Sequence, residues 1–215
     1  MSDMTLFEAI RTLRSVREFT DEPVSDEQIR TILDLAVCAP SAGNRQPWHF
    51  VVIRDGAVRR AIRDHYLASF RRYKDAVLRQ ATEGHEAARA QVARWERRGA
   101  PDTFAETLDR IPVLILVCMD RERLGLPWGE DFSASPSAYA SVYPAVQNLL
   151  LAAHGLGLGA VLTTLHLPAE REIKALLGMP APVQTVGLVP IGHPSRRHAP
   201  PRRVPAGERT HWNKW

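Results

Sequence analysis

The longest uninterrupted apolar run in this chain, Val113 to Met119, is only seven residues long. A membrane-spanning helix needs roughly 20 apolar residues, whereas a buried β-strand needs about 4–8. The run therefore predicts a short buried strand that begins at Pro112, and we expect no membrane span. Because such a strand has to be covered on both faces, the rest of the sequence must supply further strands and helices.

Three other segments have the composition of strands. Trp48 to Ile53 follows a group of turn residues and is rich in aromatic and β-branched side chains. Ala160 to Leu165 and Val183 to Ile191 are similarly apolar. We expect these segments and the Pro112–Met119 strand to form one central sheet.

Helices are predicted between the strands from capping signals and apolar spacing. Thr5-Leu6-Phe7-Glu8 has the form of a capping box and predicts a helix from Leu6 to about Leu13. Ser25-Asp26-Glu27-Gln28 is a stronger capping box, and the helix that it starts must end before Pro40.

The second half of the chain predicts two further helices. One carries an apolar stripe from Val142 to Ala153, holds Pro144 in its first turn or at a kink, and ends at Gly157-Leu158-Gly159. The other is short, from Pro168 to Leu177. Helices and strands thus interleave along a single domain of residues 1–215, which indicates a sheet between helical layers, in an α+β or α/β architecture.

Residues 57–106 are polar and rich in arginine and alanine. They predict two helices broken near Gly84, followed by a loop around Gly99-Ala100-Pro101. The segment looks too polar to form core, so we expect a helical excursion that determines substrate specificity. Its aromatic side chains either face a planar acceptor or pack against the body of the protein; they are Tyr66, Phe70, Tyr73 and Trp95.

Composition argues against several classes of protein. The chain has 28 Lys+Arg and 24 Asp+Glu, a net charge of +4, and its basic residues are spread among acidic ones, so we expect no nucleic-acid binding. The eight histidines lack the spacing of a zinc helix, and we expect no metal site.

Cys38 and Cys118 both lie in apolar surroundings and are expected to be reduced and buried. Met1 to Met4 carries acid where a signal peptide carries base, which predicts a cytoplasmic protein.

Three segments carry residues suited to chemistry. Arg14-Ser15-Val16-Arg17 places two guanidinium groups around a hydroxyl, which suits a phosphate, although a solvated basic face has the same composition. The stretch from Ala39 to Trp48 combines small residues, amides and a tryptophan beyond the needs of an ordinary turn. Arg202-Arg203 can close on the same anion. The glycine motifs of Rossmann dehydrogenases and P-loop enzymes and the serine elbow of esterases are missing from the sequence.

Together these segments resemble the FMN-dependent nitroreductase superfamily, which includes iodotyrosine deiodinases. The resemblance extends from about Thr5 to Arg203. Its motifs occur in the family's order: Arg14-Ser15-x-Arg17-x-Phe19, Ala39-Pro40-Ser41-x-x-Asn44-x-Gln46-Pro47-Trp48, Val146-Gln147-Asn148-Leu149-Leu150-Leu151-Ala152-Ala153, Gly157-Leu158-Gly159, Thr163-Thr164, Ile191-Gly192-His193-Pro194 and Arg203-x-Pro205.

The resemblance implies an α-β-α sandwich with a mostly antiparallel sheet, assembled as a swapped homodimer with FMN at the subunit interface. The residues that would bind FMN are Arg14, Ser15, Arg17, Leu162, Thr163, Thr164, Arg202 and Arg203, with Pro40 and Ser41 supplied by the partner subunit and Asn44 nearby. Leu13 and Pro201 depart from the family pattern, since relatives carry basic residues there, and this implies weaker phosphate binding. No side chain is expected to be catalytic, because the flavin N5 atom carries the chemistry.

The implied activity is ping-pong reduction of nitroaromatics, quinones or similar conjugated acceptors by NADPH or NADH. An enzyme of the same fold with another reaction, such as dehalogenation or enone reduction, is an alternative. A deiodinase-like role would require a clamp of Glu, Tyr and Lys, for which Glu83, Glu86, Tyr73 and Lys74 are available. A flavin-binding protein without turnover is a further alternative.

The segment from residue 193 to residue 215 is predicted to be an extended tail. Trp212 and Trp215 lie in it, beyond the last predicted strand. The tail is too polar to form its own core, so these side chains must be buried elsewhere. Its own chain and another subunit are equally good surfaces for that purpose.

Overall fold

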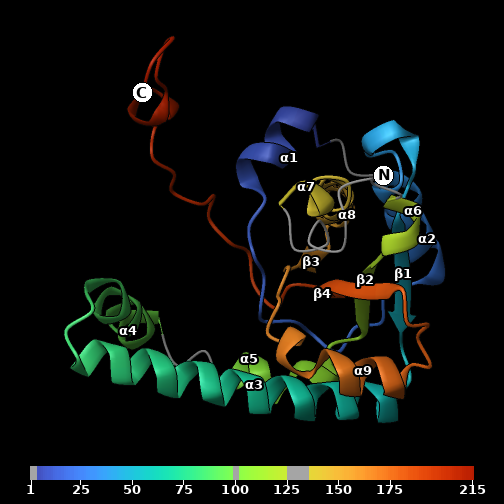
Figure 1. Cartoon of the computed structure of the whole chain (residues 1–215), viewed down its shortest axis with the longest axis horizontal. Coiled ribbons are helices and arrows are strands. Elements are labelled where there is room, and N and C mark those ends of the chain that lie inside the picture. The colour runs from blue at the N-terminus through green and yellow to red at the C-terminus, as the bar shows by residue number, and fades with distance from the viewer. Residues whose placement is uncertain (1–3, 99–101, 125–135) are drawn as a thin grey trace.

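The computed structural model describes residues 4–98, 102–124 and 136–215. One sheet forms the centre of the protein, from β1 (Trp48–Ile53), β2 (Val113–Asp120), β3 (Gly159–Ala160) and β4 (Val183–Gly192). The strand order is β1-β2-β4-β3, and all pairs are antiparallel. Helices cover both faces of this sheet (Figure 1). The predicted α+β sandwich is therefore confirmed.

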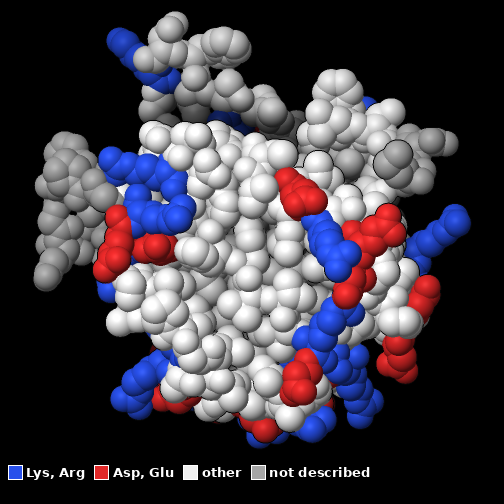
Figure 2. All heavy atoms as spheres, turned by 90° about the vertical axis from the view of Figure 1, so that its right-hand side faces the viewer, with Lys and Arg blue, Asp and Glu red and all other residues white. Residues whose placement is uncertain are grey.

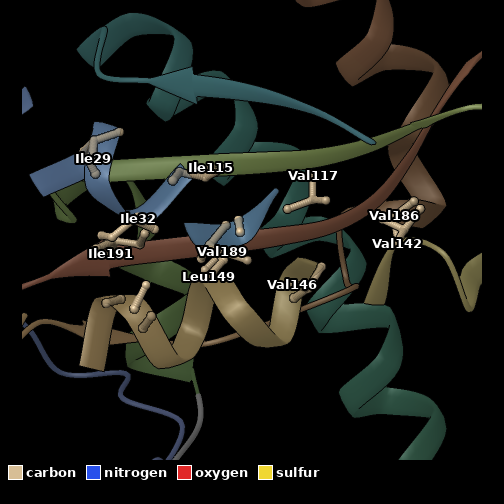
Figure 3. Close-up of a cluster of buried hydrophobic side chains, with 14 of the residues drawn as sticks. Ile29, Ile32, Ile115, Val117, Val142, Val146, Leu149, Val186, Val189 and Ile191 are labelled. Carbon is tan, nitrogen blue, oxygen red and sulfur yellow. The ribbon is translucent and has the colours of Figure 1, made fainter. Parts of the chain in front are cut away.

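The first face of the sheet is covered by α2 (Asp26–Ala36) and α8 (Tyr143–Gly155). α2 begins with the predicted capping box at Ser25, and α8 carries Pro144 in its first turn. Figure 3 shows side chains from both helices converging on β2 and β4. The residues labelled there are Ile29, Ile32, Ile115, Val117, Val142, Val146, Leu149, Val186, Val189 and Ile191.

The second face is covered by α3 (Gly56–Thr82), α5 (Asp102–Glu106) and α9 (Glu170–Leu176). The expectation that residues 57–106 contribute no core is wrong, because this segment buries four large side chains in the second cluster: Ile62, Tyr66, Phe70 and Phe104. Helical periodicity gathers sparse apolar residues on one face even when the segment as a whole is polar. The distal half of the segment, with α4 (Glu86–Arg98), lies against α3 away from the sheet (Figure 1). The break at Gly84 is as predicted, with a positive φ of 100°.

The third predicted strand is shorter than expected. β3 contains only Gly159 and Ala160, and the chain then makes one isolated bridge, between Thr163 and Leu188. Directly afterwards it turns, because the Leu167 amide donates to the Thr164 carbonyl at 3.0 Å. The predicted helix from Pro168 begins here as a 3₁₀ turn at Leu167–Ala169, which leads into α9.

The two cysteines differ in burial. Cys118 is buried in β2, as predicted, but Cys38 is exposed. Cys38 lies just beyond the end of α2, where its thiol donates to the Asp34 carbonyl at 3.3 Å. The expectation of a second buried cysteine is wrong because the apolar stripe of α2 does not extend to that position.

The remaining elements are short. They are α1 (Leu6–Thr12), α6 (Arg121–Leu124), α7 (Pro136–Tyr139) and 3₁₀ turns at Ala42–Asn44, Leu108–Arg110 and Ala206–Arg209.

The tail leaves the body of the protein (Figure 1), and the side chains of Trp212 and Trp215 are 85% and 102% exposed. Neither tryptophan is therefore buried on its own chain. Among the described residues, no helix has both the length and the apolar character needed to cross a membrane. The predicted loop at residues 99–101 lies outside the described residues.

Candidate functional site

A hollow of about 280 Å³ lies beside β3. Segments far apart in the sequence line it: the end of α1 and the residues after it, α8, the residues around β3, and the tail. The lining residues are Ile10, Leu13, Arg14, Ser15, Gln147, Leu150, Ala160, Val161, Leu162 and Arg203. Four of the predicted cofactor-binding residues, Arg14, Ser15, Leu162 and Arg203, thus meet in one place.

The segment after α1 is attached to β3 through Val16. The Val16 amide donates to the Ala160 carbonyl at 3.0 Å, and the Val16 side chain is buried. Gly159 permits this close approach, because a Cβ there would lie 2.7 Å from Val16 Cγ1. Successive side chains of an extended segment point in opposite directions. Ser15 and Arg17 accordingly stay exposed on either side of Val16.

Arg14 links this segment to the tail. Its Nη1 donates to the Ala199 carbonyl at 2.7 Å, which holds the tail near the hollow. Its Nε is buried, and no acceptor for it exists among the described residues. A buried donor without a partner is costly, and a guanidinium group binds phosphate or carboxylate well. Arg14 therefore fits an anionic ligand group in the hollow.

The surroundings of Arg14 are electropositive. The pKa of His198 is lowered, first by burial and then by the neighbouring guanidinium groups of Arg14 and Arg196. The face shown in Figure 2 is not electropositive in this way, because basic and acidic side chains lie next to one another there, around a wide uncharged area. The positive end of the hollow favours an anion.

The segment after β3 lines the opposite side of the hollow. The amide and carbonyl of Thr163 both bond to Leu188, each at 2.9 Å, so the backbone of Thr163 is committed to β4. Alternate residues of an antiparallel strand direct their backbone groups to opposite edges. The amides of Leu162 and Thr164 thus face the open edge, and the described residues provide no acceptor for either. Leu162 packs over Gly187, where a Cβ would collide with Leu162 Cδ1.

Two predicted residues contact the helical excursion instead of lining the hollow. The Thr163 hydroxyl is 2.8 Å from the Tyr66 hydroxyl of α3, and Arg17 Cζ lies 6.0 Å from the centre of the Phe104 ring. Tyr66 and Phe70 are buried, so they pack against the body, which was one of the two interpretations of the excursion's aromatic side chains. Tyr73 is 41% exposed, and its ring contacts Trp95 edge to face.

The remaining predicted residues are not among those that line the hollow within one chain. Pro40, Ser41 and Asn44 lie on the turn before β1, where the Ser41 hydroxyl accepts from the Gln46 amide at 3.0 Å. Arg202 is exposed next to Arg203. The contribution of the turn residues from a second subunit stays a prediction, as does phosphate binding by Arg202.

Sequence reasoning missed several lining residues. Ile10 and Leu150 resemble ordinary helical apolar residues, and no local signal marks them as a site. The sequence marks Leu13 only as a departure from the basic residue of the family pattern, yet its side chain lines the hollow. Gln147 could have been found, because it is a polar, exposed residue in the mostly apolar α8.

Comparison with known proteins identifies the family. A model described as the nitroreductase family matches residues 10–193 of this chain. The chain belongs to the nitroreductase family. It is 30% identical to an NADH dehydrogenase of Thermus thermophilus over 194 residues, which cover 89% of this chain and 88% of that protein. It is 31% identical to the 5,6-dimethylbenzimidazole synthase of Rhodospirillum rubrum over 200 residues, which cover 93% of this chain and 84% of that protein.

A solved structure also resembles this nitroreductase-family chain. It is an oxidised iodotyrosine deiodinase bound to FMN and 3-iodo-L-tyrosine, with a TM-score of 0.76 and 25% identity over 98% of this chain and 100% of that one. Family and relatives make the chain an oxidoreductase enzyme. Because these relatives bear the names of different reactions, the family does not define the substrate.

Proposed function

We propose that this protein is an FMN-dependent NAD(P)H:acceptor oxidoreductase that reduces nitroaromatics, quinones or similar conjugated acceptors by a ping-pong mechanism. One observation carries the proposal: Arg14, Ser15 and Arg203 meet at a hollow that Leu162 also lines, beside the sheet edge to which the free amides of Leu162 and Thr164 point. A flavin nucleotide requires both features, since its phosphate is anionic and its ring carries hydrogen-bond acceptors.

Each residue of the site has a binding role in this proposal. Arg14 and Arg203 bind the phosphate, and the buried Arg14 Nε supplies a donor that the described part of the chain does not use. Ser15 adds a hydroxyl donor, and Arg202 adds positive charge next to Arg203. Arg17 lies further along the same segment and is suited to the pyrimidine edge of the ring.

When bound, FMN would supply hydride transfer through its N5 atom. The protein positions the ring and adjusts its electrostatics. The amides of Leu162 and Thr164 can donate to the ring edge, and a nearby arginine favours negative charge on the ring. Leu13 and Leu150 exclude water from one side of the hollow.

A second copy of the chain would complete the site. We propose that Pro40, Ser41 and Asn44 of a partner subunit cover the open side of the hollow. The apolar side chains that this swapped homodimer would bury are exposed in the single chain, at 65% for Leu6, 70% for Phe7, 54% for Ile10, 85% for Trp212 and 102% for Trp215. The cytoplasm, where NAD(P)H is available, is the proposed location.

A dehalogenase-type substrate clamp is less well supported. Lys74 is committed to an ion pair with Asp102 at 2.7 Å, and the Tyr73 ring contacts Trp95. Glu83 directly follows the end of α3, at the turn to α4. Without rearrangement, Lys74 is not available to bind a substrate.

The test is the visible absorption spectrum of the purified protein, recorded anaerobically before and after NADPH, NADH and then an acceptor are added. We expect flavin bands that bleach with a nicotinamide and return with a nitroaromatic or quinone. Flavin that never bleaches would contradict the oxidoreductase cycle and favour a binding role. A colourless protein that cannot be reconstituted with FMN would overturn the cofactor assignment.

A further inference from the structure

Tyr66 connects the helical excursion to the candidate cofactor site. Its side chain is 2% exposed, and its ring packs edge to face on Phe104 with the centres 6.2 Å apart. Its hydroxyl lies 2.8 Å from the Thr163 hydroxyl. Thr163 stands between Leu162, which lines the hollow, and Thr164, whose amide faces the same open edge.

The direction of the hydrogen bond between the two hydroxyl groups follows from counting protons. Thr163 is the one hydrogen-bond partner that the described part of the chain offers to the Tyr66 hydroxyl. If Thr163 donated, the phenolic proton of Tyr66 would be buried without an acceptor, which is costly. Tyr66 therefore donates and Thr163 accepts. Burial also raises the pKa of Tyr66, so the phenol keeps its proton and remains a donor.

Thr163 is left with one polar group for a ligand. Its amide and carbonyl are bonded to Leu188, and its oxygen accepts from Tyr66. Its hydroxyl proton has no acceptor among the described residues. Because the bond to Tyr66 selects one side-chain rotamer, it also determines where that proton can be donated.

A second contact joins the excursion to the same site. The Phe104 ring is close to both Tyr66 and Arg17, at 6.2 Å from the Tyr66 ring centre and 6.0 Å from Arg17 Cζ. Arg17 also belongs to the cofactor-binding residues of the proposed function. The excursion thus contacts one such residue from the segment after α1 and one from the segment after β3.

We propose that Tyr66 is a positioning residue that orients the Thr163 hydroxyl as a donor to the bound flavin, so that α3 adjusts the redox properties of the site. The inference rests on the proposed function, since it requires FMN along Leu162–Thr164. It assigns to the excursion a role in the chemistry of the cofactor, in addition to any contact with substrate.

The experiment uses the FMN-loaded protein and the variants Tyr66→Phe, Thr163→Val, Thr163→Ser and Tyr66→Phe/Thr163→Val. Tyr66→Phe removes one oxygen and keeps the ring on Phe104. Tyr73→Phe is the matched control, because it removes the same atom from the exposed side of the same helix. The readouts are the FMN dissociation constant, the flavin absorption spectrum, the midpoint potential of the bound flavin and the thermal unfolding curve.

We expect Tyr66→Phe to weaken FMN binding by about three- to tenfold, as for the loss of one oriented hydrogen bond. Its midpoint potential should shift in the same direction as that of Thr163→Val. The double variant should shift no further than Thr163→Val alone, because Tyr66 acts through Thr163. Thr163→Ser keeps a hydroxyl and should lie closer to the wild type than Thr163→Val does, whereas Tyr73→Phe should behave like the wild type.

Two results would overturn the inference while leaving the proposed function intact. One is a Tyr66→Phe variant that binds FMN with unchanged affinity, spectrum and potential; the other is full additivity of the two single variants. If Tyr66→Phe fails to fold, Thr163→Val decides, and wild-type flavin properties in it reject the inference. A wild-type protein that binds no FMN rejects the proposed function as well.

Discussion

The centre of the sheet and its β3 edge differ in how completely their polar groups are satisfied. β2 pairs along its length with β1 and β4, and its side chains from Val113 to Met119 have no exposed surface. At the edge, β3 makes only two residue pairs and is followed by one isolated bridge. The amides of Leu162 and Thr164 and the buried Arg14 Nε have no hydrogen-bond partner among the described residues there.

The difference shows where this fold can bind a ligand. A buried strand whose backbone groups are all paired has no donor to offer, whereas an edge strand keeps donors on its free side. In this protein the segment from Arg14 to Arg17 covers only part of that edge, through Val16. The open remainder, with Arg14 and Arg203 beside it, is the candidate site. Substitutions in the centre of the sheet should therefore change the free energy of unfolding, whereas substitutions at the β3 edge should change the affinity for FMN.

The largest effect is expected at the centre, for Leu116→Ala. This side chain is fully buried in the second cluster, and its removal leaves a cavity. We expect a loss of about 2–5 kcal/mol in the free energy of unfolding, measured by urea denaturation. The folded fraction should keep its FMN affinity. Val52→Ala, at a position 36% exposed on β1, is the control and should cost less. A change in affinity larger than the change in stability would contradict this separation.

A slightly smaller effect on the free energy of unfolding is expected from the titration of His166, which follows the segment Leu162–Thr164 at the β3 edge. It is fully buried, and neither ring nitrogen has a partner among the described residues. Burial lowers the pKa of His166 from 6.5 to about 4. In the unfolded chain it takes up a proton near pH 6.5, but in the folded protein only near pH 4. The neutral form of His166 therefore makes a contribution to the free energy of unfolding that is fully present above pH 6.5. This contribution, about 3 kcal/mol, is lost as the pH is lowered toward 4.

The measurement is the free energy of unfolding of the wild type and of His166→Met between pH 7 and pH 4. The variant should lose this part of the pH dependence, while His211→Gln in the exposed tail should keep it. Identical pH profiles for the wild type and His166→Met would show that His166 does not titrate as its burial implies.

The smallest effect in free energy is expected at the edge, for Arg14→Ala. Loss of a charged hydrogen bond to phosphate corresponds to about 1.5–3 kcal/mol, or roughly 10- to 100-fold weaker FMN binding by fluorescence titration. Stability should change by less than about 1 kcal/mol, because the surrounding segment is held through Val16. Arg11→Ala is the matched control, since it removes the same charge from the exposed surface of α1. Equal FMN affinities of the two variants would remove Arg14 from the site.

Local sequence patterns predicted most of the elements. The capping signals at Thr5 and Ser25 start helices as predicted, although only Ser25 forms a complete capping box. The apolar runs of β1, β2 and β4 form the predicted strands. The errors arose where burial depends on distant contacts. The polar excursion buries Tyr66 and Phe104 because the second face of the sheet needs a cover. The predicted third strand is short because, after Ala160, only Thr163 still pairs with β4 before the chain turns.

The sequence by itself determined the family, the antiparallel sandwich and the basic segments that suit a phosphate. Tertiary structure decided which of these residues act together. Arg14 and Arg203 meet because the Arg14 side chain bonds to the Ala199 carbonyl of the tail, and Thr163 is oriented by Tyr66 from a helix 97 residues earlier in the chain. Spacing and composition describe neighbours along the chain, whereas the partner of a hydrogen bond is selected by packing across the whole fold.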